Sequence, residues 1–153
     1  MSSPLPWQST QWRQLSEQHQ ADRLPHALLL TGIKGIGKTH FAKTLAESLL
    51  CENRQIDSSS CGQCRSCLLI AAGSHPDLSV LMPEDDSKVI KIDQIRALIS
   101  SMTLSSQYTG YKVVIISPAD AMNRNAANSL LKTLEEPPAR TLLVLVTDKP
   151  AYL

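Results

Sequence analysis

The sequence predicts an α/β protein built on a doubly wound, mostly parallel sheet. Three observations lead to this prediction. An unbroken apolar run at His26–Thr31 has the composition of a strand that is buried on both faces. A glycine-rich loop follows it directly and leads into an amphipathic helix over residues 38–51 or so. Further apolar runs then alternate with helical patterns, which is the order that a sheet with helices on both faces requires.

The other elements follow from the same periodicities. The first twenty-five residues are polar, and Trp7, Trp12 and Leu15 are spaced to share one face of a short amphipathic helix. Further strands are predicted at Leu78–Met82, Tyr111–Ser117 and Thr141–Thr147, and further helices at Ile92–Met102 and Asn123–Glu136.

The last predicted helix ends at Pro137 and Pro138, because proline removes a backbone donor and clashes with the preceding turn. Two acidic residues, Glu135 and Glu136, stand just before these prolines. They are interpreted as a solvated helix end, and a contact with a partner protein is the alternative.

Composition places the chain among single globular domains, with 153 residues, 42% hydrophobic and 19% charged. A formal net charge of +1 excludes a basic surface spread over the whole protein. No stretch approaches the roughly 18 apolar residues of a membrane span. The start of the chain also lacks a secretory signal, so a cytoplasmic location is expected. The chain stops at Leu153, soon after an apolar run, which indicates a fragment of a longer protein.

A phosphate-binding loop is predicted at residues 32–39. The segment Gly32-Ile33-Lys34-Gly35-Ile36-Gly37-Lys38-Thr39 fills every fixed position of the pattern G-x-x-x-x-G-K-[ST]. The glycines let consecutive N–H groups face an anion, and the following helix adds its positive end. Lys38 is expected to reach the terminal phosphates, and Thr39 to offer its hydroxyl to Mg²⁺. The alternative is a glycine-rich turn that only connects a strand to a helix.

Hydrolysis of a bound nucleotide is not expected, because the necessary carboxylates are missing. P-loop hydrolases usually hold Mg²⁺ and the attacking water through carboxylates at the end of a later apolar strand. Here the strand Lys112–Ile116 is followed by Ser117 and Pro118, which carry no charge and no base. Asp120 lies three residues beyond the Ser117 position and is interpreted as a helix N-cap or a loop residue. No catalytic residue is predicted.

A structural zinc site is predicted in an inserted module at residues 51–67. Cys51, Cys61, Cys64 and Cys67 form the pattern C-x9-C-x2-C-x2-C, which lets four thiolates converge on one tetrahedral ion and leaves no open position. A pair of disulfides and an iron–sulfur cluster are the alternatives. His75 is nearby in sequence, but four cysteines complete the shell, so it is interpreted as an ordinary loop histidine.

Three segments resemble the clamp-loader subunits of bacterial DNA polymerase III. They are Leu24–Gly32, the four-cysteine insertion after the P-loop helix, and Asn128–Pro138, which is the most specific. The resemblance runs from about Leu24 to Thr147. In this family the gamma or tau subunit is an AAA+ ATPase with an Asp-Glu pair at the positions of Ser117 and Pro118. The delta-prime subunit shares the fold and the zinc module but lacks the pair, and this sequence resembles delta-prime.

The resemblance implies that residues 1–153 form an AAA+-type P-loop domain, with a helical lid and a C-terminal collar domain in the parent protein. It implies a place in a five-subunit ring with gamma or tau and delta. That ring opens the sliding clamp and places it on primed DNA, as part of the DNA-directed DNA polymerase holoenzyme, a nucleotidyltransferase active in DNA replication.

The resemblance also bears on nucleotide binding. An arginine-bearing Ser-Arg-Cys segment would follow Leu153, and Thr147 matches a residue that reads the γ-phosphate. Some delta-prime proteins have a degraded P-loop, whereas this one is intact, so ATP or ADP with Mg²⁺ is expected to bind without turnover. The alternatives are an active ATPase of the gamma or tau kind and a small P-loop kinase, for which no catalytic carboxylate or substrate lid is found.

Overall fold

A four-stranded parallel sheet forms the centre of the protein, in the strand order β1-β4-β3-β2. The computed structural model describes residues 9–20, 26–31, 37–52, 60–83, 88–102, 111–135 and 140–147. The strands are β1 (Ala27–Leu30), β2 (Leu78–Leu81), β3 (Lys112–Ile116) and β4 (Thr141–Val146). The helices are α1 (Ser9–Gln20), α2 (Lys38–Leu50), α3 (Arg65–Ala71), α4 (Ile92–Met102) and α5 (Arg124–Glu135), with a 3₁₀ turn η2 at Ala119–Ala121. The predicted parallel α/β sheet is thereby confirmed.

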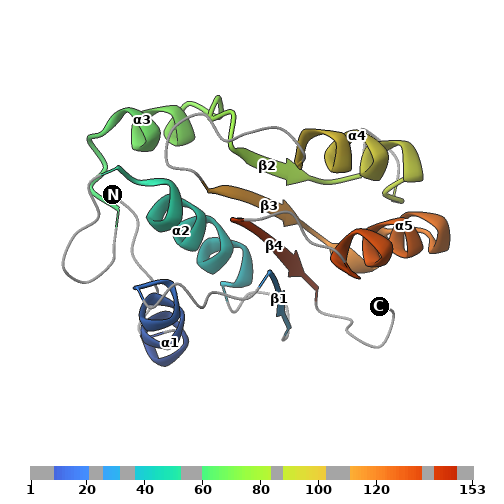
Figure 1. The fold of residues 1–153 in the computed structure, drawn as a ribbon, viewed down its shortest axis with the longest axis horizontal. Coiled ribbons are helices and arrows are strands. Elements are labelled where there is room, and N and C mark those ends of the chain that lie inside the picture. The colour runs from blue at the N-terminus through green and yellow to red at the C-terminus, as the bar shows by residue number, and fades with distance from the viewer. Residues whose placement is uncertain are drawn as a thin grey trace.

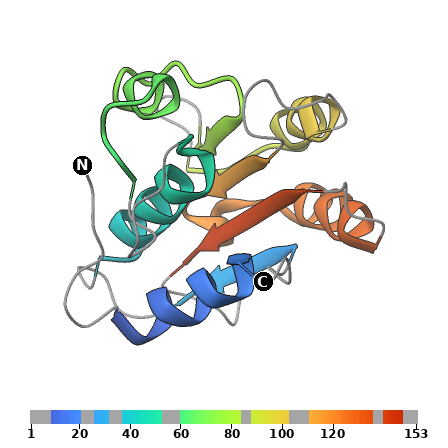
Figure 2. The same cartoon turned by 60° about the vertical axis from the view of Figure 1, so that its left-hand side comes forward.

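Helices cover both faces of this sheet. Figures 1 and 2 show α2 on one face, with α1 beside it, and α4 and α5 on the other. Side chains of β3 alternate between the two layers: Val113 and Ile115 join the core under α1 and α2, whereas Val114 and Ile116 join the core under α4 and α5. Strand side chains alternate between faces with a period of two, so a strand covered on both sides must be apolar throughout. This explains the apolar runs of β3 and β4, which are mostly buried. Strand β1 instead lies at the edge of the sheet, its residues are only partly buried and Leu29 is 48% exposed, so the prediction of a strand buried on both faces at His26–Thr31 is wrong.

Helix α1 packs against the beginning of the same core. The ring of Trp12 meets Phe41 of α2 edge-on, with ring centroids 6.0 Å apart and planes at 89°. Trp12 and Leu15 are both buried, as the predicted amphipathic helix requires. Trp7, the third residue of that pattern, lies outside the described residues.

Helix α3 was not predicted from the sequence. It is only 7 residues long, and its N-cap is Cys64, whose sulfur accepts a hydrogen bond from the backbone N–H of Cys67. A helix of two turns is too short to show an apolar periodicity, and its start depends on the thiols around it. The described residues contain no helix that is long and apolar enough to cross a membrane.

Helix α2 joins the two candidate sites of the protein. Gly37 caps its beginning and Cys51 caps its end, where the N–H of Cys51 donates to the carbonyl of Glu47. One end of this helix therefore carries the end of the predicted phosphate loop, and the other carries the first of the four cysteines.

Candidate functional site

Three of the eight residues of the predicted phosphate loop are described, and they stand at the beginning of α2. Of its residues, Gly32, Ile33, Lys34, Gly35 and Ile36 lie outside the described residues, whereas Gly37, Lys38 and Thr39 lie within them. Gly37 has a φ of 87°, which favours glycine, and its carbonyl accepts the N–H of Phe41 at 2.9 Å. Lys38 and Thr39 are the first two residues of α2. The described part of the loop thus has the turn into a helix that the motif requires.

Strand β4 lies between β1 and β3, and this order decides which residues border the loop. The backbone N–H of Thr147, just after β4, donates to the carbonyl of Leu30 at 3.0 Å. Thr147 therefore lies beside the strand that leads into the loop, and it is only 1% exposed. Ser117 follows β3, one strand further away, and its N–H donates to the carbonyl of Leu81 at 3.1 Å.

Asp120 contacts the end of β4 from the 3₁₀ turn after β3. The hydroxyl of Thr147 donates a short hydrogen bond to its Oδ1 atom. The cap of α5 is instead Asn123, whose Oδ1 accepts the N–H of Ala126 at 2.8 Å, so the N-cap interpretation of Asp120 is wrong. The pair joins residues 27 positions apart, and it could be foreseen only by knowing that β3 and β4 are neighbours.

The four predicted cysteines come together in one cluster. Their Sγ atoms all lie within 4.8 Å of one another. Cys51 and Cys64 have their sulfurs 3.8 Å apart, and Cys61 and Cys67 have theirs 3.9 Å apart. A tetrahedron with metal–sulfur bonds of about 2.3 Å has edges of about 3.8 Å, so the two pairs match opposite edges of such a shell. All four are free thiols, and together they can hold a metal ion such as zinc.

Backbone N–H groups point at the sulfurs of this cluster. Cys61 Sγ accepts hydrogen bonds from the N–H groups of Cys64 at 3.2 Å and of Gln63 at 3.4 Å. The bonds from Gln63 and Cys64 lower the pKa of the Cys61 thiol to about 6, because they stabilise the thiolate. Burial instead raises the pKa of Cys67 to about 12. Cys61 therefore ionises readily, whereas Cys67 is expected to lose its proton only in exchange for a metal ion.

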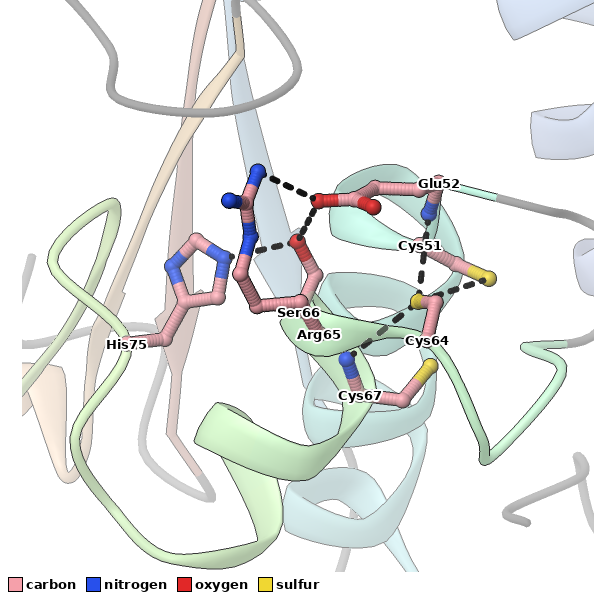
Figure 3. Close-up of polar contacts among 7 residues, drawn as sticks. All are labelled: Cys51, Glu52, Cys64, Arg65, Ser66, Cys67 and His75. Carbon is pink, nitrogen blue, oxygen red and sulfur yellow. Dashed lines mark hydrogen bonds and ion pairs between the residues drawn. The ribbon is translucent and has the colours of Figure 1, made fainter.

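A chain of polar contacts runs from the cysteine cluster through Glu52 and Ser66 to His75, as Figure 3 shows. Glu52 Oε1 accepts hydrogen bonds from Arg65 at 3.2 Å and from the hydroxyl of Ser66 at 3.4 Å. The Nε2 atom of His75 lies 3.2 Å from the same hydroxyl, and its Nδ1 atom accepts the N–H of Asp77 at 3.0 Å. Since Nδ1 accepts, Nε2 carries the proton in the neutral ring and donates to Ser66.

His75 is more than the ordinary loop histidine that its sequence indicated. It lies outside the four-cysteine cluster, but it is only 5% exposed and both of its ring nitrogens are engaged. The sequence signal was weak, because a single histidine beside a proline is compatible with an exposed loop. Its role depends on Ser66 and Asp77, which the fold brings to it from either side.

The stability of the protein is expected to fall in acid because of His75. Burial lowers the pKa of His75 below 6.5, and this effect outweighs the attraction of Asp77 and Glu52. Near pH 6.5 the unfolded chain therefore binds a proton at His75 that the folded protein does not yet bind. The contribution of neutral His75 to the free energy of unfolding is complete above that pH, and it is lost as the pH falls through the pKa of His75 in the folded protein. Urea unfolding of metal-saturated protein at a series of pH values measures this, and the slope cannot exceed about 1.4 kcal/mol per pH unit for one proton.

The matched control is His75→Asn, whose side-chain oxygen can accept the Asp77 N–H but does not titrate. The cysteines and carboxylates titrate in both proteins, so only the difference between the two profiles reports on His75. Parallel profiles below pH 6.5 would contradict the prediction.

Comparisons with known proteins relate the chain to subunits of DNA polymerase III. A family model described as "DNA polymerase III, delta subunit" matches residues 7–153. The DNA polymerase III subunit delta' of Pseudomonas aeruginosa is 46% identical over 100% of this chain and 45% of its own length. The DNA polymerase III subunit gamma of Buchnera aphidicola is 39% identical over 82% of this chain and 34% of its own length.

A solved structure has the same fold. The crystal structure of a DNA polymerase III gamma subunit-related protein from Thermotoga maritima aligns with a TM-score of 0.64 and 21% identity, over 94% of this chain and 40% of that one. At this identity the likeness concerns the fold alone. The chain spans less than half the length of each of these three proteins.

Proposed function

Because the chain belongs to the DNA polymerase III delta-subunit family, we propose that it acts as part of a clamp-loader subunit of the delta' kind. In this proposal residues 1–153 form its AAA+-type domain, with the cysteine module inserted at residues 51–67. The subunit would join gamma or tau and delta in a ring that places the sliding clamp on primed DNA. Its place of action is then the bacterial cytoplasm, where the chromosome is replicated.

The observation that carries the proposal is the pair Ser117 and Pro118 at the end of β3. A nucleotide-hydrolysing site needs carboxylates there to hold Mg²⁺ and to activate water. Neither residue has a charge or a titratable group, while the glycine loop keeps its lysine and threonine. These features support a subunit that works through protein contacts and does not hydrolyse nucleotide itself.

We further propose that the loop binds ATP or ADP with Mg²⁺. The proposed site comprises Gly32, Ile33, Lys34, Gly35, Ile36, Gly37, Lys38 and Thr39. The turn at Gly37 and the position of Lys38 and Thr39 at the start of α2 support it, because the helix N-terminus and the lysine both attract phosphate. The intact lysine and threonine argue for occupancy of the site, whereas Ser117 and Pro118 argue against turnover.

For the cysteine cluster we propose a structural zinc ion held by Cys51, Cys61, Cys64 and Cys67. Four thiolates fill a tetrahedral shell and leave no position for a substrate or a reactive water. Such an ion would tie the end of α2 to α3, since Cys51 caps the first helix and Cys67 lies on the second.

An active ATPase of the gamma or tau kind is the alternative function, favoured only by the complete loop motif. The full-length protein assayed alone is expected to release no phosphate from ATP above the background of the buffer. A gamma or tau preparation assayed in parallel provides the positive control. Steady turnover that disappears in Lys38→Ala would overturn the proposal.

Assembly provides the second arm of this test. Mixed with gamma or tau and delta, the protein is expected to elute in one complex that loads the clamp on primed DNA, and a mixture without it should not load the clamp. Loading at an undiminished rate in its absence would exclude the proposed role.

A further inference from the structure

The contact between Thr147 and Asp120 places a carboxylate at the end of β4, next to the strand that leads into the proposed nucleotide loop. The phosphate-loop motif does not include this carboxylate. Asp120 lies in the 3₁₀ turn η2 after β3, and its Oδ1 atom accepts the hydrogen bond donated by the hydroxyl of Thr147. Thr147 follows β4 and is 1% exposed, so water does not compete for this hydroxyl. The contact therefore holds the side chain of Thr147 in one orientation.

Thr147 also lies beside the strand that leads into the phosphate loop. Its backbone N–H donates to the carbonyl of Leu30 at 3.0 Å, and only Thr31 separates Leu30 from Gly32. In parallel α/β sheets, ligands bind outside the carboxyl ends of the strands, next to the first strand and its loop. A nucleotide on this loop would thus have the end of β4 as a neighbour.

A threonine hydroxyl has one proton to donate. An ionised phosphate oxygen only accepts hydrogen bonds, so it can bond to this hydroxyl only if the proton points at it. In the structure that proton is directed to Asp120. The negative carboxylate also disfavours the approach of a further negative phosphate group.

We infer that Asp120 is a specificity-determining residue, which holds the hydroxyl of Thr147 away from nucleotide and makes the loop indifferent to the presence of a third phosphate. This inference rests on the proposed binding of nucleotide to the loop. It adds that ATP and ADP bind equally well, and that the cause is the single hydrogen bond between the ends of β3 and β4.

The test is the ratio of the ADP and ATP dissociation constants, measured with Mg²⁺ by calorimetry on the full-length protein. The unchanged protein is expected to give a ratio within about twofold of one. In Asp120→Ala the hydroxyl of Thr147 is free to donate to the third phosphate of ATP, and the negative charge that disfavours this phosphate is gone. ATP is therefore expected to bind about tenfold more tightly than ADP. Thr147→Val should keep the ratio near one, and the double variant, which loses the charge but has no hydroxyl to donate, should favour ATP by only about threefold.

These measurements separate four outcomes that contradict the inference. If Asp120 instead binds Mg²⁺ beside the phosphates, Asp120→Ala will weaken ATP binding relative to ADP, which is the opposite sign and overturns the inference. A strong ATP preference of the unchanged protein that Thr147→Val abolishes also overturns it. If nucleotides bind and Asp120→Ala leaves the ratio unchanged, the inference fails while the proposed nucleotide site stands. If neither nucleotide binds, the inference and the proposed nucleotide site both fail, whereas the proposed clamp-loader role is tested separately by assembly.

Thermal unfolding first establishes that each variant folds. Should Asp120→Ala not fold, Asp120→Asn replaces it, because the amide keeps an acceptor for Thr147 but removes the charge. A shift of the ratio toward ATP of about threefold is then expected, and no shift overturns the inference.

Discussion

Cys67→Ser is expected to abolish metal binding and to destabilise the folded protein by about 4 kcal/mol or more, within the range for loss of a structural metal. Cys67 is buried on α3, and its sulfur lies 3.9 Å from that of Cys61. Serine offers a hard oxygen where the ion needs a soft thiolate, so three sulfurs remain and the tetrahedral shell is lost. The midpoint of thermal unfolding should fall by roughly 10 °C or more.

Two measurements check this expectation together. Metal analysis of protein purified without added metal should give about one equivalent of zinc for the unchanged protein and almost none for the variant. A strong chelator should lower the midpoint of the unchanged protein and have little further effect on Cys67→Ser.

Ser74→Ala is the matched control, because Ser74 lies just beyond the same helix and is exposed, and its hydroxyl donates a weak hydrogen bond to the carbonyl of Ala72 at 3.4 Å. It should change the stability by less than about 0.5 kcal/mol. If Cys67→Ser kept both its metal and its midpoint, the closed four-thiolate site would be excluded. Iron in place of zinc would support the shell but correct the identity of the ion.

The second large effect is expected from Lys38→Ala, which should weaken ATP binding about a hundredfold. Lys38 is the first residue of α2, directly after the left-handed turn at Gly37, where a lysine can reach phosphate. Lys38 is only partly buried, so the unfolding midpoint of the variant should change little. Fluorescence titration with a labelled nucleotide measures the affinity directly.

Lys43→Ala provides the control of equal charge on the same helix. Lys43 is exposed and lies more than a turn further from the loop, so its removal should leave the affinity within about twofold. Equal binding by Lys38→Ala and the unchanged protein would show that nucleotide does not use this loop.

The sequence predicted the sheet better than the contacts that surround the sites. Apolar runs such as Val113–Ile116 were unambiguous, because a strand segment buried on both faces has no polar positions. The cysteine cluster was also predictable, since its spacing alone requires close approach. In contrast, the periodicity of apolar residues along the chain does not predict the order of strands in the sheet. It therefore gave no indication that β4 separates β1 from β3.

The unpredicted residues depend on that order or on short local structure. Asp120 was interpreted as a cap because its partner Thr147 is distant in sequence, and the two meet only when β3 pairs with β4. His75 was underestimated because its burial depends on the unpredicted helix α3, which carries Ser66. The loop residues Gly32–Ile36 lie outside the described residues, so their part in phosphate binding stays a prediction.

Helix α2 makes the protein suited to spectroscopy. Its 13 residues, at a rise of about 1.5 Å each, set the capped ends at Gly37 and Cys51 about 20 Å apart. Cobalt(II) exchanged into the four thiolates would be coloured and paramagnetic, and it would lie about 20 Å from the end of the helix that carries Gly37. Nuclear relaxation or energy transfer could then measure the distance between the metal ion and a labelled nucleotide, without attaching a dye to the protein.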